Sequence, residues 1–567
     1  MKKTRALAIS LLVVIIVLLG SAAAFSRDYQ DSWILEGLEI PFVLFVVTFA
    51  LTFFLEKREL GLVTLAVLGR TVFMLIPNLK YVWFQGVYID QQQQYALANY
   101  VVNQGHTSAL GPYEYTATPL LHLLLSVFSI VPGVPLAQAL KYLPVVFSLI
   151  YPLLTYLIIK KLTFLERTPV LKLALFISSI PFTFEQFLIT GTSFGVFLAF
   201  LILFCLLTIF EKKDRRYWLI TVLFLFALVA GHSISSIIIM LLVSGVLIVQ
   251  KIGFLKSKMS FSLSVALTFV SFCIAWLVFQ APATLNIVVS LIVNAIRGGQ
   301  APTTDVIPPT FFSLANANVF AAVETFLVFY GADIFLLCMS VLGMVFLLAK
   351  RNRLNGVAKF LLLFGGLDFG LILVGVFLGL GPTRALTFQR LLFPIFFGIS
   401  IYYLSKKKPW IRATLFVLLI SLSTVEFFAA QPLVAPAKLL YKELPASVPL
   451  GYVSQVNTIY QRKVAVFAIS NAEGRIACDE HTRNLMIGLG GYNFSTVHLD
   501  NYYYPLDKSK PLQEYDLFII HMPGKSGTLG EKAEIRSPTL ILDAVDDSSI
   551  VYTNGESYIL ANNNYQP

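Results

Sequence analysis

A polar, tyrosine-rich segment between apolar stretches carries the residues best suited to chemistry in this chain. It covers Tyr81 to Thr118 and contains amide side chains, a histidine and Asp90. A solvated aspartate is ionised near neutral pH and can accept a proton as a transition state develops. Asp90 is therefore the first candidate for a catalytic group.

The elements that position Asp90 can be predicted from the same stretch. Asp90 begins an expected helix, Gln91 to Asn103, and Gly105 is the residue type favoured just after a last helical turn. An apolar segment from Leu120 to Val131 then ends at a Pro-Gly pair. Because this segment is too short to span a bilayer easily, we expect it to lie along the membrane surface.

The composition places this segment in a membrane protein. The 567 residues are 57% hydrophobic and 13% charged, whereas soluble domains carry about 25% charged residues. Apolar runs of about 20 residues can each cross the hydrocarbon core, and in lipid they must be helices. We expect a polytopic α-helical membrane protein with about 13 spans, at residues 6–24, 37–55, 61–77, 136–159, 170–188, 193–210, 217–231, 233–250, 260–280, 327–349, 357–379, 391–405 and 412–430.

Basic residues predict the orientation of these spans. The net charge is +11, but Lys and Arg gather in alternate short connections such as EKREL, EKKDRR and SKKKPWIR, which favours helix orientation over nucleic-acid binding. We expect a multi-pass protein of a prokaryotic plasma membrane, bacterial or archaeal, with a cytoplasmic N-terminus and an external C-terminus. The first apolar segment also resembles a signal peptide cleaved after Ala24, although we prefer a retained helix.

Two domains are expected. Residues 1–431 form the transmembrane domain, in which residues 78–135 make an external catalytic loop with interfacial helices and residues 281–326 make a second long external loop. Residues 432–567 are more polar and predict a small external α/β domain. Its expected strands are the runs 464–469, 515–520 and 539–543 and a hairpin around Asn554-Gly555, and residues 483–489 are an expected short helix.

The first external loop resembles that of the GT-C superfamily of membrane glycosyltransferases. The resemblance rests on an Asp, a helix of the type D-x4-[YH]-x2-A, a Gly about fifteen residues on, an aromatic turn, and P-x2-H on an amphipathic helix. It covers residues 60–430 by architecture and residues 88–150 by motif. The matching residues are Asp90, Tyr95, Ala98, Gly105, Tyr113, Tyr115, Pro119 and His122.

This resemblance implies an inverting hexosyltransferase that works at the external face. Asp90 would be the general base that deprotonates an acceptor hydroxyl, which then attacks the anomeric carbon of a polyprenyl-phosphate-linked sugar. The acceptor would be a glycan, a lipid or a protein. Since family members commonly place an Arg before a late span, Arg390 would bind the carrier phosphate, with Arg384 as the alternate; both can instead be interfacial residues that meet lipid headgroups.

Two departures from the family pattern bear on the expected metal site and on the kind of sugar transfer. Asp90 lies between Ile89 and Gln91, so no carboxylate pair supports a metal site, and the four cysteines have no metal-ligand spacing. We therefore expect no metal and no other cofactor. The Trp-Trp-Asp-Tyr-Gly signature of the oligosaccharyltransferase branch is missing from residues 432–567. Transfer of a single sugar, as in dolichyl-phosphate-mannose-dependent enzymes, is thus favoured over en bloc transfer.

Further polar residues are candidates for substrate contact, each with a structural alternative. They are Tyr95 in the first loop, His122 on the interfacial segment, Glu185 at the outer end of a span, and His232 in a tight external turn. Arg70 and Asp368 are charges inside spans and would be stabilised by pairing with each other.

Two other functions compete with the glycosyltransferase hypothesis. A transporter or flippase of lipid-linked sugars would favour midplane polar residues and paired repeats, whereas this sequence has few such charges and no visible repeat. An envelope-polymer ligase would carry its large polar loop late in the chain, whereas the loop with Asp90 comes early.

Overall fold

The computed structural model describes most of the membrane part of the chain and short pieces of the C-terminal part. The described ranges are 2–25, 39–80, 89–105, 117–162, 167–180, 191–212, 215–251, 263–296, 319–350, 354–377, 382–406, 410–411, 414–415, 417–419, 421–422, 467–468, 476–478, 486, 499–501, 517–521, 548–553 and 557–562.

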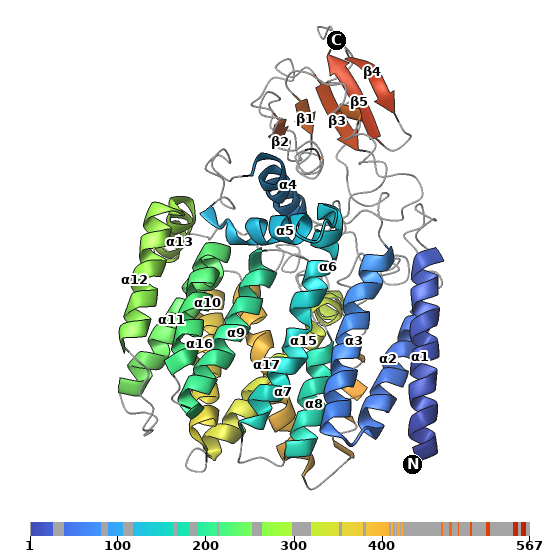
Figure 1. The fold of residues 1–567 in the computed structure, drawn as a ribbon, viewed down its shortest axis with the longest axis vertical. Coiled ribbons are helices and arrows are strands. Elements are labelled where there is room, and N and C mark those ends of the chain that lie inside the picture. The colour runs from blue at the N-terminus through green and yellow to red at the C-terminus, as the bar shows by residue number, and fades with distance from the viewer. Residues whose placement is uncertain are drawn as a thin grey trace.

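Long apolar helices form a bundle whose members lie side by side (Figure 1). Their composition explains the arrangement, because helices satisfy their own backbone groups and their apolar side chains can face lipid. By length and hydropathy, three described helices can each cross a membrane, or four if the bent pair α12–α13 counts as one. The bundle helices are α1 Lys2–Phe25, α2 Glu39–Leu55, α3 Glu59–Lys80, α6 Leu136–Ser148, α7 Ile150–Lys160, α8 Arg167–Ser179, α9 Gly191–Lys212, α10 Arg215–Gly231, α11 Ser233–Lys251, α12 Leu263–Phe279, α15 Val319–Ala349, α16 Gly356–Phe377 and α17 Pro382–Ser405.

Each predicted span up to residues 391–405 overlaps a described helix or helix pair, and the span 170–188 is described only as far as residue 180. The span 136–159 is divided into α6 and α7. Pro152 accounts for the break, because it has no N–H to donate to the carbonyl of Ser148. The last predicted span, 412–430, lies largely outside the described residues.

Three helices depart from the predicted boundaries. The loop predicted at 281–326 contains helix α13, Pro282–Ile296, and α15 already begins at Val319. Helix α17 begins at Pro382, so the segment 381–390, expected to be a loop, is almost entirely helical. Polar residues in these segments suggested loops, but a helix end that emerges from lipid tolerates them.

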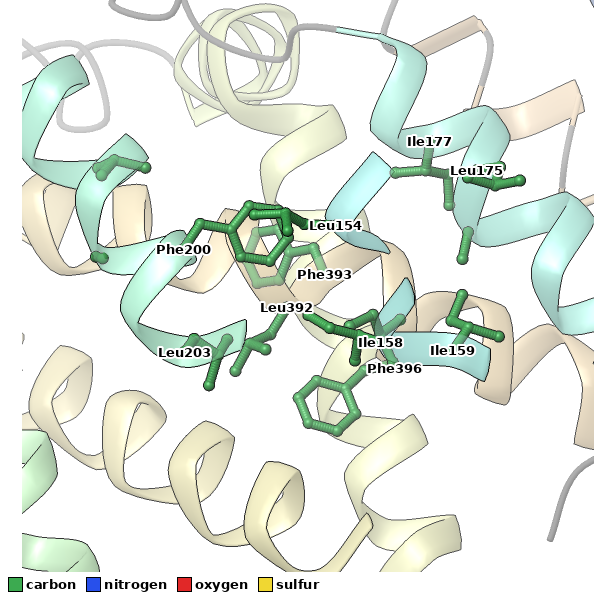
Figure 2. Packing of buried hydrophobic residues seen from close by; sticks show 14 of the residues in the cluster. Leu154, Ile158, Ile159, Leu175, Ile177, Phe200, Leu203, Leu392, Phe393 and Phe396 are labelled. Carbon is green, nitrogen blue, oxygen red and sulfur yellow. The ribbon is translucent and has the colours of Figure 1, made fainter. Parts of the chain in front are cut away.

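The core of the bundle is built from α7, α8, α9 and α17. Leu154 and Ile158 of α7, Phe200 of α9 and Phe393 and Phe396 of α17 are almost completely buried and converge in one cluster (Figure 2). Because lipid is as apolar as these side chains, close packing and small residues hold such helices together.

Two short helices lie at one end of the bundle. Helix α5, Leu120–Ile130, runs across the ends of the bundle helices, and α4, Ile89–Gln104, lies above it (Figure 1). Gly105 has φ +75° and Gly133 has φ +68°, the left-handed conformation that glycine adopts readily. The predicted helix after Asp90 and the predicted non-spanning segment are therefore confirmed as helices.

A five-stranded mixed sheet lies beyond α4, at the same end of the molecule, and the N-terminus lies at the opposite end (Figure 1). Its order is β2-β1-β3-β5-β4; β1 is parallel to β2 and β3, and β5 is antiparallel to β3 and β4. The strands are β1 Ile476–Cys478, β2 Leu499–Asn501, β3 Leu517–His521, β4 Ser548–Thr553 and β5 Ser557–Asn562.

The sheet tests the strand predictions for residues 432–567. The hairpin around Asn554-Gly555 is confirmed by the antiparallel pair β4–β5, and β3 overlaps the predicted run 515–520. The prediction of a strand at 464–469 is wrong where the structure describes it, because Phe467 and Ala468 are helical. The run 539–543 lies outside the described residues.

Candidate functional site

Asp90 lies in the first turn of α4, at the end of the bundle that also carries α5. The structure describes its backbone, and its side chain lies outside the described part. Helix α4 ends cleanly, since the N–H of Gly105 donates to the carbonyl of Val101 at 2.9 Å. Asp90 thus lies at the start of a short helix whose C-terminal end is fixed by Gly105.

Helix α4 is held by its contacts with α5. The hydroxyl of Ser126 donates to the carbonyl of Ala98 at 3.1 Å and to that of His122 at 2.8 Å, which joins the two helices. Helix α5 in turn packs on α6 and α10. Since Leu121 and Leu125 are buried, the α4–α5 pair is anchored to the bundle core.

Tyr95 and His122 occupy different environments in this pair. Tyr95 is half-buried against the hydrophobic core. His122 is 1% exposed, so its imidazole lies within the packed face of α5 and away from bulk water. Both residues lie on the two helices that position Asp90, and their substrate contacts stay predictions.

Arg384 and Arg390 lie in the first turns of α17, and their side chains are outside the described part. A helix places residues six apart roughly 120° around its axis and about 9 Å along it. A single phosphate is therefore expected to meet one of the two arginines and not both.

Contacts between helices show which end of the bundle carries these arginines. Lys160 at the end of α7 lies 4.0 Å from Glu59 at the start of α3, and Asn355 before α16 donates to the carbonyl of Lys161 at 2.7 Å. Helix α16 starts at this end and runs 22 residues, about 33 Å, toward the other. Because α17 begins five residues after α16 ends, its first turns lie at the same end as α4.

His232 lies in the short turn between α10 and α11. Its Nδ1 accepts the backbone N–H of Ser235 at 3.2 Å and lies 2.6 Å from the hydroxyl of Ser235. A neutral ring that accepts at Nδ1 carries its hydrogen on Nε2. Gly191 makes room for this ring, since an added Cβ would lie 2.7 Å from its Cδ2. Glu185, the neighbouring candidate, lies outside the described residues.

The two intramembrane charges do not form the pair suggested by the sequence. Arg70 is 2% exposed, and its guanidinium lies over the ring of Tyr151 at 5.2 Å from the centroid. Asp368 is fully buried on α16, and within the described residues neither of its carboxylate oxygens has a hydrogen-bond partner. Arg70 therefore lies against an aromatic ring, whereas Asp368 is buried apart from it. The sequence alone does not specify these two environments.

A metal site would need several ligating side chains close together. Among the side chains that the structure describes, no three His, Cys, Asp or Glu residues come together as a metal site. The side chain of Asp90 is outside this set, so the expectation of no metal stays a prediction.

Two contacts of the site could not be anticipated from the sequence. The hydroxyl of Ser126 joins α5 to α4, and the indole N–H of Trp276 on α12 donates to the carbonyl of Ala117 at 3.0 Å. The second contact joins residues 159 positions apart, and neither residue belongs to a recognisable motif. For the Ser126 contact, the only indication in the sequence was a small hydroxyl side chain on the amphipathic helix α5.

Solved structures with a similar fold are archaeal oligosaccharyltransferases from Archaeoglobus fulgidus. The AglB complex with an inhibitory peptide and a dolichol-phosphate is 12% identical, with a TM-score of 0.50, over 82% of this chain and 69% of that one. The likeness shows a shared fold. The apo form has the same identity and TM-score over 83% and 70% of the two chains. The form tethered to an acceptor peptide with an NVT sequon has the same identity and TM-score over 90% of this chain and 74% of that one.

At 12% identity the likeness to these structures concerns the fold alone. No family model and no curated protein matches the sequence. The GT-C resemblance inferred from the loop around Asp90 agrees with this similarity of fold to oligosaccharyltransferases. The roles of the individual residues rest on chemistry and placement.

Proposed function

We propose that this protein is a membrane glycosyltransferase that moves a sugar from a polyprenyl-phosphate donor to an acceptor at the external membrane face. The observation that carries the proposal is the placement of Asp90 on α4 and of Arg384 and Arg390 on α17 at one end of a helix bundle whose fold is similar to that of oligosaccharyltransferases. An acid and a cation at one membrane surface provide what group transfer from a lipid phosphate needs.

In the proposed reaction Asp90 is the general base. Its carboxylate takes the proton of the acceptor hydroxyl while the hydroxyl oxygen forms a bond to the anomeric carbon. The bond from that carbon to the phosphate oxygen breaks, and its electron pair stays on the phosphate. Direct displacement inverts the anomeric configuration, so the enzyme is an inverting hexosyltransferase.

An arginine of α17 stabilises the phosphate as it leaves. Its planar guanidinium can bind two phosphate oxygens at once, and Arg390 is the preferred candidate over Arg384. Glu185, His122, His232 and Tyr95 are proposed as further substrate contacts.

The proposal includes an orientation in the membrane. The N-terminus is cytoplasmic, about 13 helices span the bilayer, and residues 432–567 form an external α/β domain that assists acceptor binding or packing. Basic residues at the end of the bundle that holds the start of α3 and the end of α7, such as Lys57, Arg58 and Lys160, support this orientation.

En bloc oligosaccharide transfer is the second candidate function. The observation that favours it is that all three compared structures are oligosaccharyltransferases that match 82–90% of this chain. The missing Trp-Trp-Asp-Tyr-Gly signature favours transfer of a single sugar.

A donor comparison in proteoliposomes tests the proposal. The purified protein is given radiolabelled polyprenyl-phosphate mannose or glucose, or a polyprenyl-pyrophosphate oligosaccharide, with a sequon peptide or a lipid-linked glycan as acceptor. Transfer from a monophosphate donor supports the proposal, and whole-oligosaccharide transfer to the peptide supports the second candidate. Movement of labelled lipid between leaflets without any transfer would contradict both and favour a flippase.

A further inference from the structure

A sharp corner joins helices α12 and α13 at the end of the bundle that carries Asp90. The axes of Ala266–Phe279 and Thr284–Ser290 differ by 105°, and α13 follows immediately on the corner (Figure 1). The N–H groups of Gln280 and Ala281 both donate to the carbonyl of Trp276, at 2.8 and 3.0 Å. Trp276 is therefore the residue on which the last turn of α12 closes.

The side chain of Trp276 reaches from this corner to the start of α5. Its indole N–H donates to the carbonyl of Ala117 at 3.0 Å, two residues before Pro119, the N-cap of α5. A backbone carbonyl just ahead of a helix has no partner within that helix. The bond therefore fixes the direction in which the chain enters α5.

Aromatic neighbours hold the indole in place. The ring of Phe272, one turn earlier on α12, lies 5.9 Å from that of Trp276, and Phe226 of α10 meets Phe272 edge-to-face at 4.3 Å. An indole packed in this way loses little freedom when it donates its N–H, because its orientation is already set. The chain of contacts runs from α10 through α12 to the start of α5.

We propose that Trp276 is a positioning residue that couples the two external loops of the protein. It ties the corner between α12 and α13, where the second loop was predicted to begin, to the start of α5 in the first loop, and α5 carries α4 and Asp90 through Ser126. The role in catalysis rests on the proposed glycosyltransferase function, whereas the mechanical link stands on the contacts alone.

Loss of the Trp276 bond should lower turnover, because group transfer needs the catalytic group in an exact position. Displacing a catalytic group by about 1 Å can lower turnover roughly a hundredfold. Loss of the indole bond leaves α4 and α5 attached through Ser126, Leu121 and Leu125, so the catalytic loop is still folded but less exactly placed. Turnover should fall, while binding of the donor should change little.

The test compares Trp276→Phe with Trp410→Phe in the full-length protein. The first variant keeps an aromatic ring and removes the N–H, and the second removes an indole that is 63% exposed. Three quantities are measured: kcat and KM for the lipid-linked donor, hydrogen exchange of the α5 amides, and the thermal unfolding midpoint.

We expect Trp276→Phe to lower kcat at least about tenfold with an almost unchanged donor KM. Exchange should become faster at the first hydrogen-bonded amides of α5, beginning with Leu123, and stay unchanged in α7 and α9, and the unfolding midpoint should match that of Trp410→Phe. Unchanged kcat, unchanged α5 exchange, or faster exchange throughout the bundle would each overturn the proposal.

Hydrogen exchange separates this inference from the proposed function. If the wild-type protein transfers no sugar from any donor, the glycosyltransferase proposal fails while the link is still tested. A selective increase of exchange at the start of α5 would then support the link between the loops, and wild-type exchange would overturn it.

Discussion

Asp90 and the arginines of α17 come from distant parts of the chain, and their helices bring them to the same end of the bundle. Asp90 is fixed through α4, whereas Arg384 and Arg390 are fixed by the direction in which α17 enters the membrane. Each of these residues lies near the start of its helix. The chemistry at the residue scale therefore depends on which face of a helix a residue occupies.

The two arginines can be separated by substitution. Loss of a charge-assisted contact costs roughly 1.5–3 kcal/mol, so Arg390→Gln should raise the donor KM about tenfold to a hundredfold. Arg384→Gln is the matched control on the same helix and should change the donor KM much less, because the two positions point in different directions. Steady-state kinetics with varied donor measure both. A larger effect from Arg384→Gln would reverse the assignment.

At the scale of elements, close helix contacts hold the arginine-bearing helix in the bundle. Gly343 of α15 faces the backbone of α17 at Phe396, and the hydroxyl of Ser400 donates to the carbonyl of Met339 beside it. A Cβ on Gly343 would overlap the carbonyl oxygen of Phe396. This contact sets the separation of α15 and α17 below the site.

Gly343→Ala should therefore destabilise the protein by about 1–3 kcal/mol, because backbone atoms of α17 must move to admit the methyl group. The control is Gly366→Ala on α16, where an added Cβ meets nothing within 4 Å. Thermal unfolding in detergent should show a lower midpoint for the first variant alone. Equal midpoints for the two variants would contradict the tight α15–α17 contact.

Elements with local signals were predictable from the sequence, and those defined by distant contacts were not. Gly105 and the Pro-Gly pair after Val131 marked the ends of α4 and α5, and Asn554-Gly555 marked the β4–β5 hairpin. Helix α13 and the first turns of α17 were missed because polar residues there suggested loops.

For the candidate site too, local features could be predicted from the sequence and contacts between distant helices could not. The sequence indicated Asp90 and the arginines by residue type and topology, and the fold brings their helices to one end. The Trp276–Ala117 bond and the environments of Arg70 and Asp368 could not be inferred, since they depend on how separate helices pack.

At the scale of the whole molecule, the two ends of the bundle differ in chemistry. One end carries α4, α5 and the first turns of α17, with the sheet beyond them (Figure 1). The other carries basic residues, including Lys57, Arg58 and Lys160. The proposed function requires the first end to be external.

Cysteine labelling tests this orientation in intact cells. After Cys205, Cys273, Cys338 and Cys478 are replaced by alanine, single cysteines are introduced as Gln104→Cys or Lys350→Cys, at exposed positions on opposite ends. A membrane-impermeant maleimide should label the first variant directly and the second only after permeabilisation, because Lys350 belongs to a basic connection. The reverse pattern would contradict the external site.

The measurement that tests the central claim most directly is sugar transfer by Asp90→Asn in proteoliposomes. Asparagine keeps the size of the side chain and removes its ability to take a proton, and Gln91→Asn provides a control on the same helical turn. We predict that Asp90→Asn lowers kcat at least about a hundredfold at equal folded yield, whereas Gln91→Asn stays near wild type. Transfer that survives Asp90→Asn would contradict the assignment of Asp90 as the general base.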